Sequence, residues 1–247
     1  MTVDLAGGSY IQRLRQAERL PDKKLVTNIL NAGSTVYDPL LALAIDVELL
    51  HQQEPACYAP LHALRLLGEM PQPAMVEQLL QVLPIDIDDP EKEVVQLWTH
   101  ELPQIMARMG DEVVDQLWAI VDNEEYELTG RGIVLIALAY TTVIVPDSRS
   151  GVITKIHERL STSDNKTFTG YMVSTLGNLG AEQAYADVMK LFREGCVDQA
   201  IIPPGVARQL LLSDSTRRLA DVKLSFWERY DELGPFGETQ PDEQFVS

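Results

Sequence analysis

The segment Val76-Glu77-Gln78-Leu79-Leu80-Gln81-Val82-Leu83 decides the fold, because its pattern returns later in the chain. The second copy is Val114-Asp115-Gln116-Leu117-Trp118-Ala119-Ile120-Val121, an offset of 38 residues between positions 76 and 114. In both copies apolar side chains fall at i, i+3, i+4 and i+7, which is one face of an amphipathic helix. The pattern therefore predicts a helix that recurs along the chain.

Two further copies of the apolar stripe follow. The third consists of Ile153, Ile156, His157 and Leu160, and the fourth of Tyr185, Val188, Met189 and Phe192. A single amphipathic helix cannot bury its own stripe, but copies stacked side by side form one continuous core. The repeat thus favours a solenoid.

A second helical pattern precedes each stripe, so the repeating unit is a helix pair. These partner helices are predicted at 56–70, 90–109, 128–143 and 165–179, and further helices at 22–30, 38–52, 203–212 and 215–230. The best candidate for a strand, 141–145, is short and more consistent with a helix end. We predict an all-α fold, a right-handed α-solenoid of antiparallel helix pairs of the HEAT or armadillo type. It forms one domain over 9–233, with untethered residues at 1–8 and 234–247.

The chain resembles a bacterial family of HEAT-like repeat proteins of unknown function from about residue 20 to residue 236. The likeness rests on scattered scaffold positions: Leu20-Pro21, Tyr37-Asp38-Pro39-Leu40-Leu41, Tyr58-Ala59-Pro60-Leu61-His62-Ala63-Leu64, Leu67-Gly68-Glu69, Leu179-Gly180-Ala181-Glu182 and Phe192-Arg193-Glu194-Gly195-Cys196-Val197-Asp198. The resemblance implies the solenoid fold and brings no catalytic residue or substrate with it.

The charge balance narrows the classes of partner. Lys and Arg number 20 against 37 Asp and Glu, a net charge of −17, so nucleic acid and anionic membranes would be repelled. No apolar run reaches the length of a membrane span, and two cysteines are too few for a disulfide framework. We expect a cytoplasmic protein whose partner is another protein with a basic surface. The sequence is compatible with a monomer or a homodimer.

Two acidic clusters mark the turns between repeats. The first contains Asp86, Asp88, Asp89 and Glu91, and the second Asp122, Glu124 and Glu125. Several carboxylates could hold Ca²⁺, but the first cluster lacks the glycine and the distal glutamate of a calcium-binding loop. A solvated turn with a capping aspartate explains it better. Stacking of the repeats would bring both clusters to one edge as an acidic stripe for a basic partner.

A third candidate lies in the helix at 90–109, where Trp98, His100 and Glu101 precede Pro103. Proline inside a helix predicts a kink, and polar and aromatic groups crowd it. The structural interpretation is that these residues only pack around a distorted helix, with His100 and Glu101 facing solvent. The functional one is a site at the kink.

Catalytic, cofactor and metal signatures are missing from the sequence. No two of the four histidines have the i, i+4 spacing of a helical metal pair, and there is no Cys-x-x-Cys. Gly130-Arg131-Gly132 has glycines typical of a phosphate loop, but it follows no strand and lacks a further glycine or lysine, which predicts a turn.

The leading hypothesis is therefore a non-enzymatic scaffold that binds another protein, without a cofactor. Its candidate surface comprises both acidic clusters with Trp98, His100 and Glu101. The alternative is an enzyme, or a protein that assists one, acting on a small cofactor near these last three residues.

Overall fold

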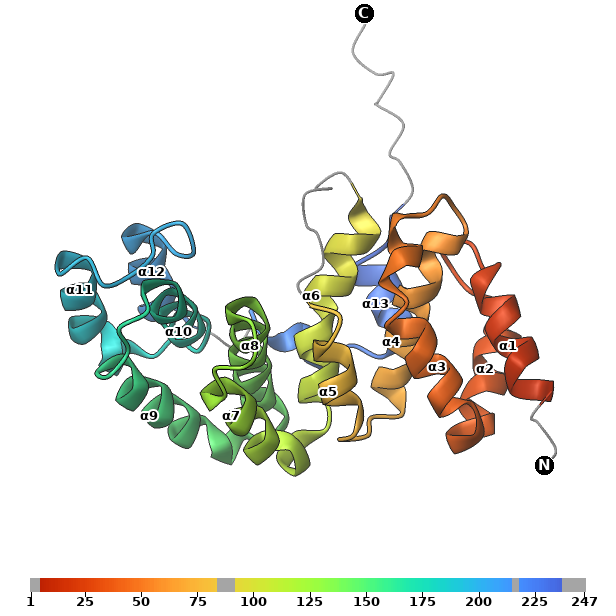
Figure 1. The fold of residues 1–247 in the computed structure, drawn as a ribbon, viewed down its shortest axis with the longest axis horizontal. Coiled ribbons are helices and arrows are strands. Elements are labelled where there is room, and N and C mark those ends of the chain that lie inside the picture. The colour runs from red at the N-terminus through yellow and green to blue at the C-terminus, as the bar shows by residue number, and fades with distance from the viewer. Residues whose placement is uncertain (1–4, 84–91, 215–217, 237–247) are drawn as a thin grey trace, which may run out of the picture. The chain divides into compact units, whose positions relative to one another are not determined.

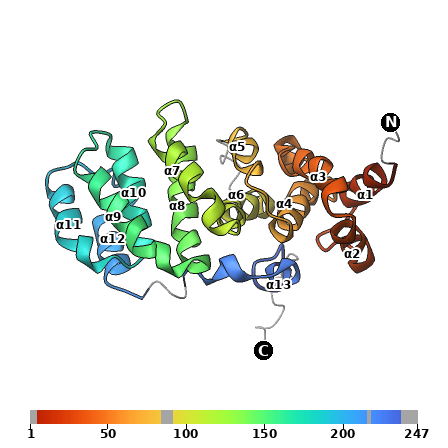
Figure 2. The same cartoon turned by 90° about the horizontal axis from the view of Figure 1, so that it is seen from below.

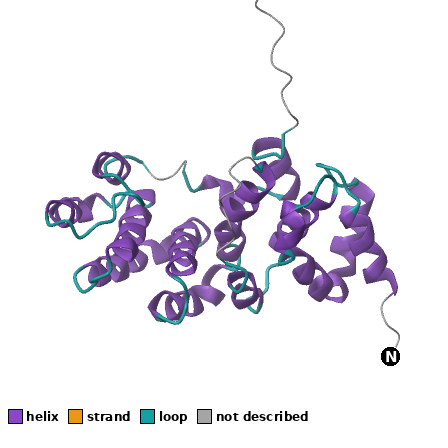
Figure 3. Ribbon diagram, turned by 45° about the horizontal axis from the view of Figure 1, so that its top comes forward, coloured by secondary structure: helices purple, strands orange, loops and turns teal. Residues whose placement is uncertain are grey.

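The computed structural model describes residues 5–83, 92–214 and 218–236, and all the regular structure in these ranges is helical (Figure 3). The all-α prediction is confirmed for this part of the chain. None of the described helices combines the length and apolar character needed to cross a membrane.

The contacts divide the chain into two compact units. Unit 1 comprises Met1–Ile105 and Leu224–Ser247, and unit 2 comprises Met106–Lys223. Unit 1 contains α1 (Leu5–Arg15), α2 (Lys23–Ala32), α3 (Tyr37–Ala44), α4 (Ala59–Glu69), α5 (Met75–Leu80), nearly all of α6 (Glu93–Ala107), and α13 (Phe226–Glu232) (Figure 1). Unit 2 contains α7 (Val114–Asp122), α8 (Leu128–Ile144), α9 (Arg149–Leu160), α10 (Lys166–Asn178), α11 (Tyr185–Arg193) and α12 (Pro204–Leu211).

Short 3-10 segments link or extend these helices. They are Gly33–Val36, Val47–His51, Ala56–Tyr58, Gly110–Val113, Pro146–Ser148, Glu182–Ala184 and Ala220–Lys223. Two helices predicted as continuous are interrupted by them. The predicted helix at 38–52 divides into α3 and Val47–His51. The one predicted at 215–230 divides at Ser225, because Ser225 and Glu228 form a capping box that starts α13.

Side-chain caps fix other helix starts where the sequence predicts them. Asp22 accepts a hydrogen bond from the backbone N–H of Leu25 at 2.9 Å and starts α2. Asn165 does the same for Phe168 at 3.0 Å and starts α10. Each cap satisfies a backbone donor that the helix itself leaves unpaired.

The repeated apolar stripes form the core of each unit. Val76, Leu79 and Leu80 are buried in unit 1. In unit 2 the buried members of the second and third stripes are Leu117, Trp118, Val121, Ile153, Ile156 and Leu160. The fourth stripe differs, since only Val188 is fully buried and its other members are half-buried. Its helix, α11, packs chiefly on α12, so it has little neighbouring surface in which to bury the rest.

Some residues on either side of the predicted domain, 9–233, have a described structure. α1 begins at Leu5, inside the stretch expected to be untethered. Near the C-terminus, Phe236 donates its backbone N–H to Glu93 at 3.0 Å and accepts a hydrogen bond from Arg19 at 3.3 Å. α13 packs on α4 although more than 150 residues separate them, as Figure 2 shows. The C-terminal helix is therefore an integral part of unit 1.

In unit 2, α10 contacts both α8 and α12. Glycine makes the α8–α10 approach possible, because a Cβ at Gly132 would lie 2.8 Å from ring atoms of Tyr171. The same α8 carries Gly130, where a Cβ would meet no atom within 4 Å.

These two glycines provide a matched pair for a stability test. We expect Gly132→Ala to lower the free energy of unfolding by about 1 kcal/mol, since overpacking outweighs the gain in helix propensity. Gly130→Ala is expected to raise it by up to about 1 kcal/mol, because only the propensity gain applies. Urea denaturation of both variants checks the prediction. A Gly132→Ala protein as stable as Gly130→Ala would contradict the close approach.

Candidate functional site

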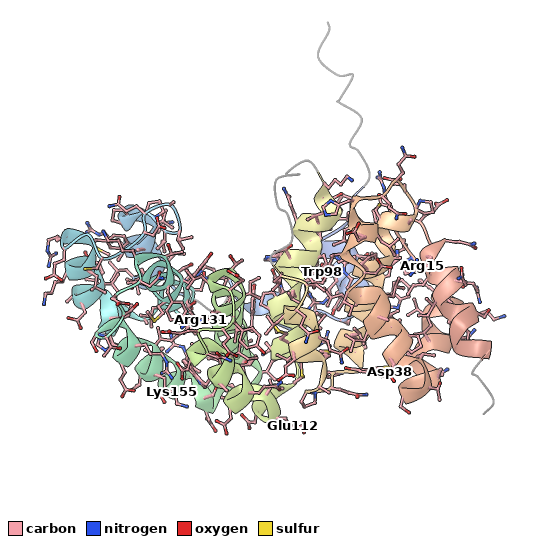
Figure 4. The ribbon with its side chains drawn as sticks, viewed as in Figure 1. Arg15, Asp38, Trp98, Glu112, Arg131 and Lys155 are labelled. Carbon is pink, nitrogen blue, oxygen red and sulfur yellow. The ribbon has the colours of Figure 1, made fainter. Side chains whose placement is uncertain are left out.

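The structure places the three residues of the expected kink in α6 in different environments. Trp98 and Glu101 are fully buried, whereas His100 is exposed. Figure 4 labels Trp98 on α6. Its indole N–H donates to the carbonyl oxygen of Ala44 at 3.0 Å and so joins α6 to α3. Trp98 and Glu101 are consequently not on the surface, and the expectation that Glu101 faces solvent is wrong.

Glu101 is the centre of a buried hydrogen-bonded network in unit 1. Its carboxylate accepts hydrogen bonds from Arg65 Nε at 2.9 Å and Nη2 at 2.5 Å, and from Arg229 Nη1 at 3.3 Å. Arg229 also donates to Gln104 Oε1 at 2.8 Å. The side chains of Arg65, Glu101 and Arg229 are all fully buried. The network joins α4, α6 and α13.

The same network continues to His62 and Tyr230. The guanidinium carbon of Arg65 lies 4.2 Å from the centre of the Tyr230 ring. His62 Nε2 donates to the Glu18 carbonyl oxygen at 2.8 Å, so its Nδ1 accepts from the Tyr230 hydroxyl at 2.5 Å. The polar groups near the proposed kink therefore hold helices together.

The first acidic cluster, with Asp86, Asp88, Asp89 and Glu91, lies outside the described residues. The acidic stripe expected from both clusters stays a prediction. Only the second cluster has a described structure.

The second cluster lines a pocket of about 650 Å³ in unit 2. The pocket lies between the turn that joins α7 to α8 and the turn that joins α9 to α10. Five exposed carboxylates line it: Asp122, Glu124, Glu125, Glu127 and Asp164. Ligand pockets commonly have a volume of about 300–1,000 Å³. The predicted residues Asp122, Glu124 and Glu125 are thus brought together, and Glu127 and Asp164 join them.

Arg159 is the pocket's paired cation. It makes a two-pronged ion pair with Asp122, from Nε at 2.7 Å and from Nη2 at 2.5 Å, and its guanidinium carbon lies 4.4 Å from the ring centre of Trp118. The hydrogen bonds with Asp122 raise the pKa of Arg159 above its ordinary value. Trp118 thereby serves both as core and as a platform for Arg159.

Arg131 is the second cation that lines the pocket, and it is only 9% exposed. Its Nε donates to the carbonyl oxygen of Val121 at 2.9 Å, and its guanidinium carbon lies 4.1 Å from the ring centre of Phe168. Arg131 belongs to the first turns of α8. The turn expected at Gly130-Arg131-Gly132 is therefore wrong, because these residues continue the helix that starts at Leu128.

Unit 1 has another pocket, of about 480 Å³, beside Arg19 and Glu54. Here the polar groups already bind one another: Arg19 donates to Glu54 and to the Tyr58 hydroxyl, each at 2.9 Å. Glu54 in turn accepts from Tyr58 at 2.5 Å, and these bonds lower the pKa of the Glu54 carboxyl. This cluster is satisfied within the protein.

Metal-ligating side chains do not gather in the part of the chain that the structure describes. No group of three or more His, Cys, Asp or Glu side chains there could hold a metal ion. The Nε2 atom of His157, a member of the third stripe, instead lies 2.9 Å from Oδ2 of Asp187 on α11. Both cysteines are free thiols, and burial raises the pKa of Cys57.

The chain was compared with models of protein families, with curated proteins and with solved structures, and it matches none of them.

Proposed function

We propose that this protein is a non-enzymatic binding protein that takes a cationic segment of another protein into the pocket of unit 2. The observation that supports the proposal is the pocket's lining of five exposed carboxylates and two arginines, one of which is already paired with Asp122. A cationic segment would find compensating charge on several sides. The net charge of −17 favours the same class of partner over long distances.

The fold offers this pocket through two successive helical hairpins, α7–α8 and α9–α10. We also propose that the helix pairs predicted from the sequence, such as α8–α9, are HEAT-like repeats with a right-handed winding. The recurring buried stripes support the repeat assignment, and so does the position of the pocket between equivalent turns. Repeat proteins commonly use such turns and the surfaces beside them for recognition. The composition, with two cysteines, favours the cytoplasm as the setting.

The test measures the affinity of a pool of N-acetylated, lysine-rich hexapeptides that end in an amide. We expect Glu124→Gln combined with Glu125→Gln to weaken binding by about tenfold, because exposed ion pairs contribute up to about 1 kcal/mol each. Added salt should weaken binding to the wild-type protein as well, since exposed charges are screened. Isothermal titration calorimetry gives both results.

The matched control combines Asp111→Asn with Glu112→Gln, an exposed acidic pair of unit 2 that does not line the pocket. It removes the same charge and should bind within about twofold of wild type, since distant exposed charges are largely screened. Equal weakening by the two double variants would show that only the overall charge matters. Absence of binding to the lysine-rich pool would overturn the proposed function.

A further inference from the structure

Arg131 is held in one orientation by two contacts that leave part of its guanidinium unused. The Nε hydrogen bond to Val121 fixes the plane at one edge, and the Phe168 ring covers one face. The two Nη groups remain. Among the described residues neither has a hydrogen-bond acceptor, although Arg131 is more than nine-tenths buried.

The Nη groups of Arg131 have no ion-pair partner in the part of the chain that the structure describes, although a carboxylate lies close to Arg131 in the sequence. Glu127 precedes Arg131 by four residues and lines the same pocket, yet no ion pair forms between Arg131 and any of the five described carboxylates there. Neither Nη atom of Arg131 is among the fully buried polar atoms that lack a partner, so both are accessible from the pocket. The arrangement is that of a binding group prepared for an acceptor from outside the protein.

Helix geometry adds positive potential at the same place. α8 begins at Leu128, and α10 begins after its cap Asn165; both residues line the pocket. The N-terminal end of a helix carries a partial positive charge and free backbone N–H groups, which favour an anion. Arg131, which is nearly buried, and two helix starts thus place positive potential in a pocket whose five exposed carboxylates, here called the rim, are negative.

The rim determines which anion fits. A phosphate group carries up to two negative charges and would be repelled by five carboxylates. A carboxylate carries one charge, matches the planar fork of arginine, and can arrive with cationic groups beside it. The end of a chain brings a carboxylate to Arg131 with the fewest other atoms. Capture of a terminal carboxylate is a known mode of peptide recognition.

We propose that Arg131 binds the C-terminal carboxylate of a partner chain whose last residues include Lys or Arg, while Glu124, Glu125 and Asp164 of the rim bind those cationic side chains. This proposal rests on the proposed function and specifies its partner: a basic C-terminal segment. Arg131 supplies selectivity for the free chain end, and the rim supplies attraction for positive charge.

The test compares the amidated lysine-rich pool with the same pool carrying a free C-terminal carboxylate. We expect the wild-type protein to bind the free acid about tenfold more tightly, in line with a hydrogen bond between charged groups. In Arg131→Gln the ratio should fall to about one. Arg131→Lys keeps the charge but loses the fork, and should retain only part of the preference. Arg193→Gln, an exposed arginine on α11, should leave the ratio unchanged.

Thermal melts by circular dichroism accompany each titration, so that the ratio is read only from folded protein. If an Arg131 variant fails to fold, the wild-type ratio between acid and amide still decides. Equal binding of acid and amide by the wild-type protein would overturn the carboxylate proposal and leave the proposed function standing. A free-acid preference that survives in folded Arg131→Gln would also overturn it. Absence of binding of either pool would instead remove the proposed function.

Discussion

Glu101→Gln should lower the free energy of unfolding by about 3–5 kcal/mol, which is the usual cost of removing one partner from a buried ion pair. The substitution keeps the volume of the side chain and removes its charge. Arg65 and Arg229 would then lose the carboxylate that accepts hydrogen bonds from both of them while they stay fully buried. Against a typical total stability of about 5–15 kcal/mol, the loss is a large fraction.

Urea denaturation of the full chain, followed by tryptophan fluorescence, measures this effect. Trp98 and Trp227 belong to unit 1 and Trp118 to unit 2, so the loss is expected in the transition that the unit 1 tryptophans report. The neighbouring His100 provides the control, because His100→Gln changes an exposed side chain and should alter stability by less than about 0.5 kcal/mol. A loss below about 1 kcal/mol for Glu101→Gln would contradict the buried network.

The spacing of residues in α6 indicates that Glu101 is buried, although a charged residue is usually exposed. Trp98, Glu101 and Ile105 are spaced by three and four residues, so they share the buried face of α6. An acidic residue at such a position predicts a buried partner. Its partners Arg65 and Arg229 cannot be predicted from one sequence, because they lie 36 and 128 residues away in the chain.

The helix pairs are much easier to predict, because their determinants are local. The stripe through Leu117, Trp118 and Val121 follows from spacing alone, and the start of α10 at Asn165 follows from the cap. The pocket can be predicted from the sequence only in part. Asp122, Glu124 and Glu125 are a visible acidic turn, and Arg131 follows them in the same hairpin, whereas Asp164 joins them only when two hairpins pack together.

The division at Ser225 shows how local signals can compete. The run at 215–230 has helical spacing overall, but Ser225 and Glu228 have the spacing of a capping box. The box starts a new helix and orients Arg229 toward Glu101 and Gln104. The cap thus positions the long-range network.

His62 should make the free energy of unfolding of unit 1 depend on pH. Burial lowers the pKa of His62 from 6.5 to about 3, and the positive charge of Arg65 acts in the same direction. The hydrogen bonds of the ring also require a neutral imidazole, since Nδ1 accepts from the Tyr230 hydroxyl and Nε2 donates to the Glu18 carbonyl oxygen. Charging it would break the first of these bonds and place a cation beside Arg65.

The direction of the effect follows from proton binding. Between pH 6.5 and about 3 the unfolded chain binds a proton at His62 that the folded protein does not. Acidification therefore favours unfolding. The contribution of His62 is fully present above pH 6.5 and is lost as the pH falls. At about 1.4 kcal/mol for each pH unit, the loss between pH 7 and pH 5 is about 2 kcal/mol.

Urea denaturation at pH 7, 6 and 5 measures this loss, and His62→Gln identifies its source. The variant has a reduced stability at pH 7, because two buried hydrogen bonds change, but its stability should fall by about 2 kcal/mol less than wild type on going to pH 5. His100→Gln, which alters an exposed histidine, should follow the wild-type pH dependence. Parallel pH profiles for wild type and His62→Gln would show that His62 takes up its proton in the folded protein. The neutral histidine would then not be the link through which α4 holds α13.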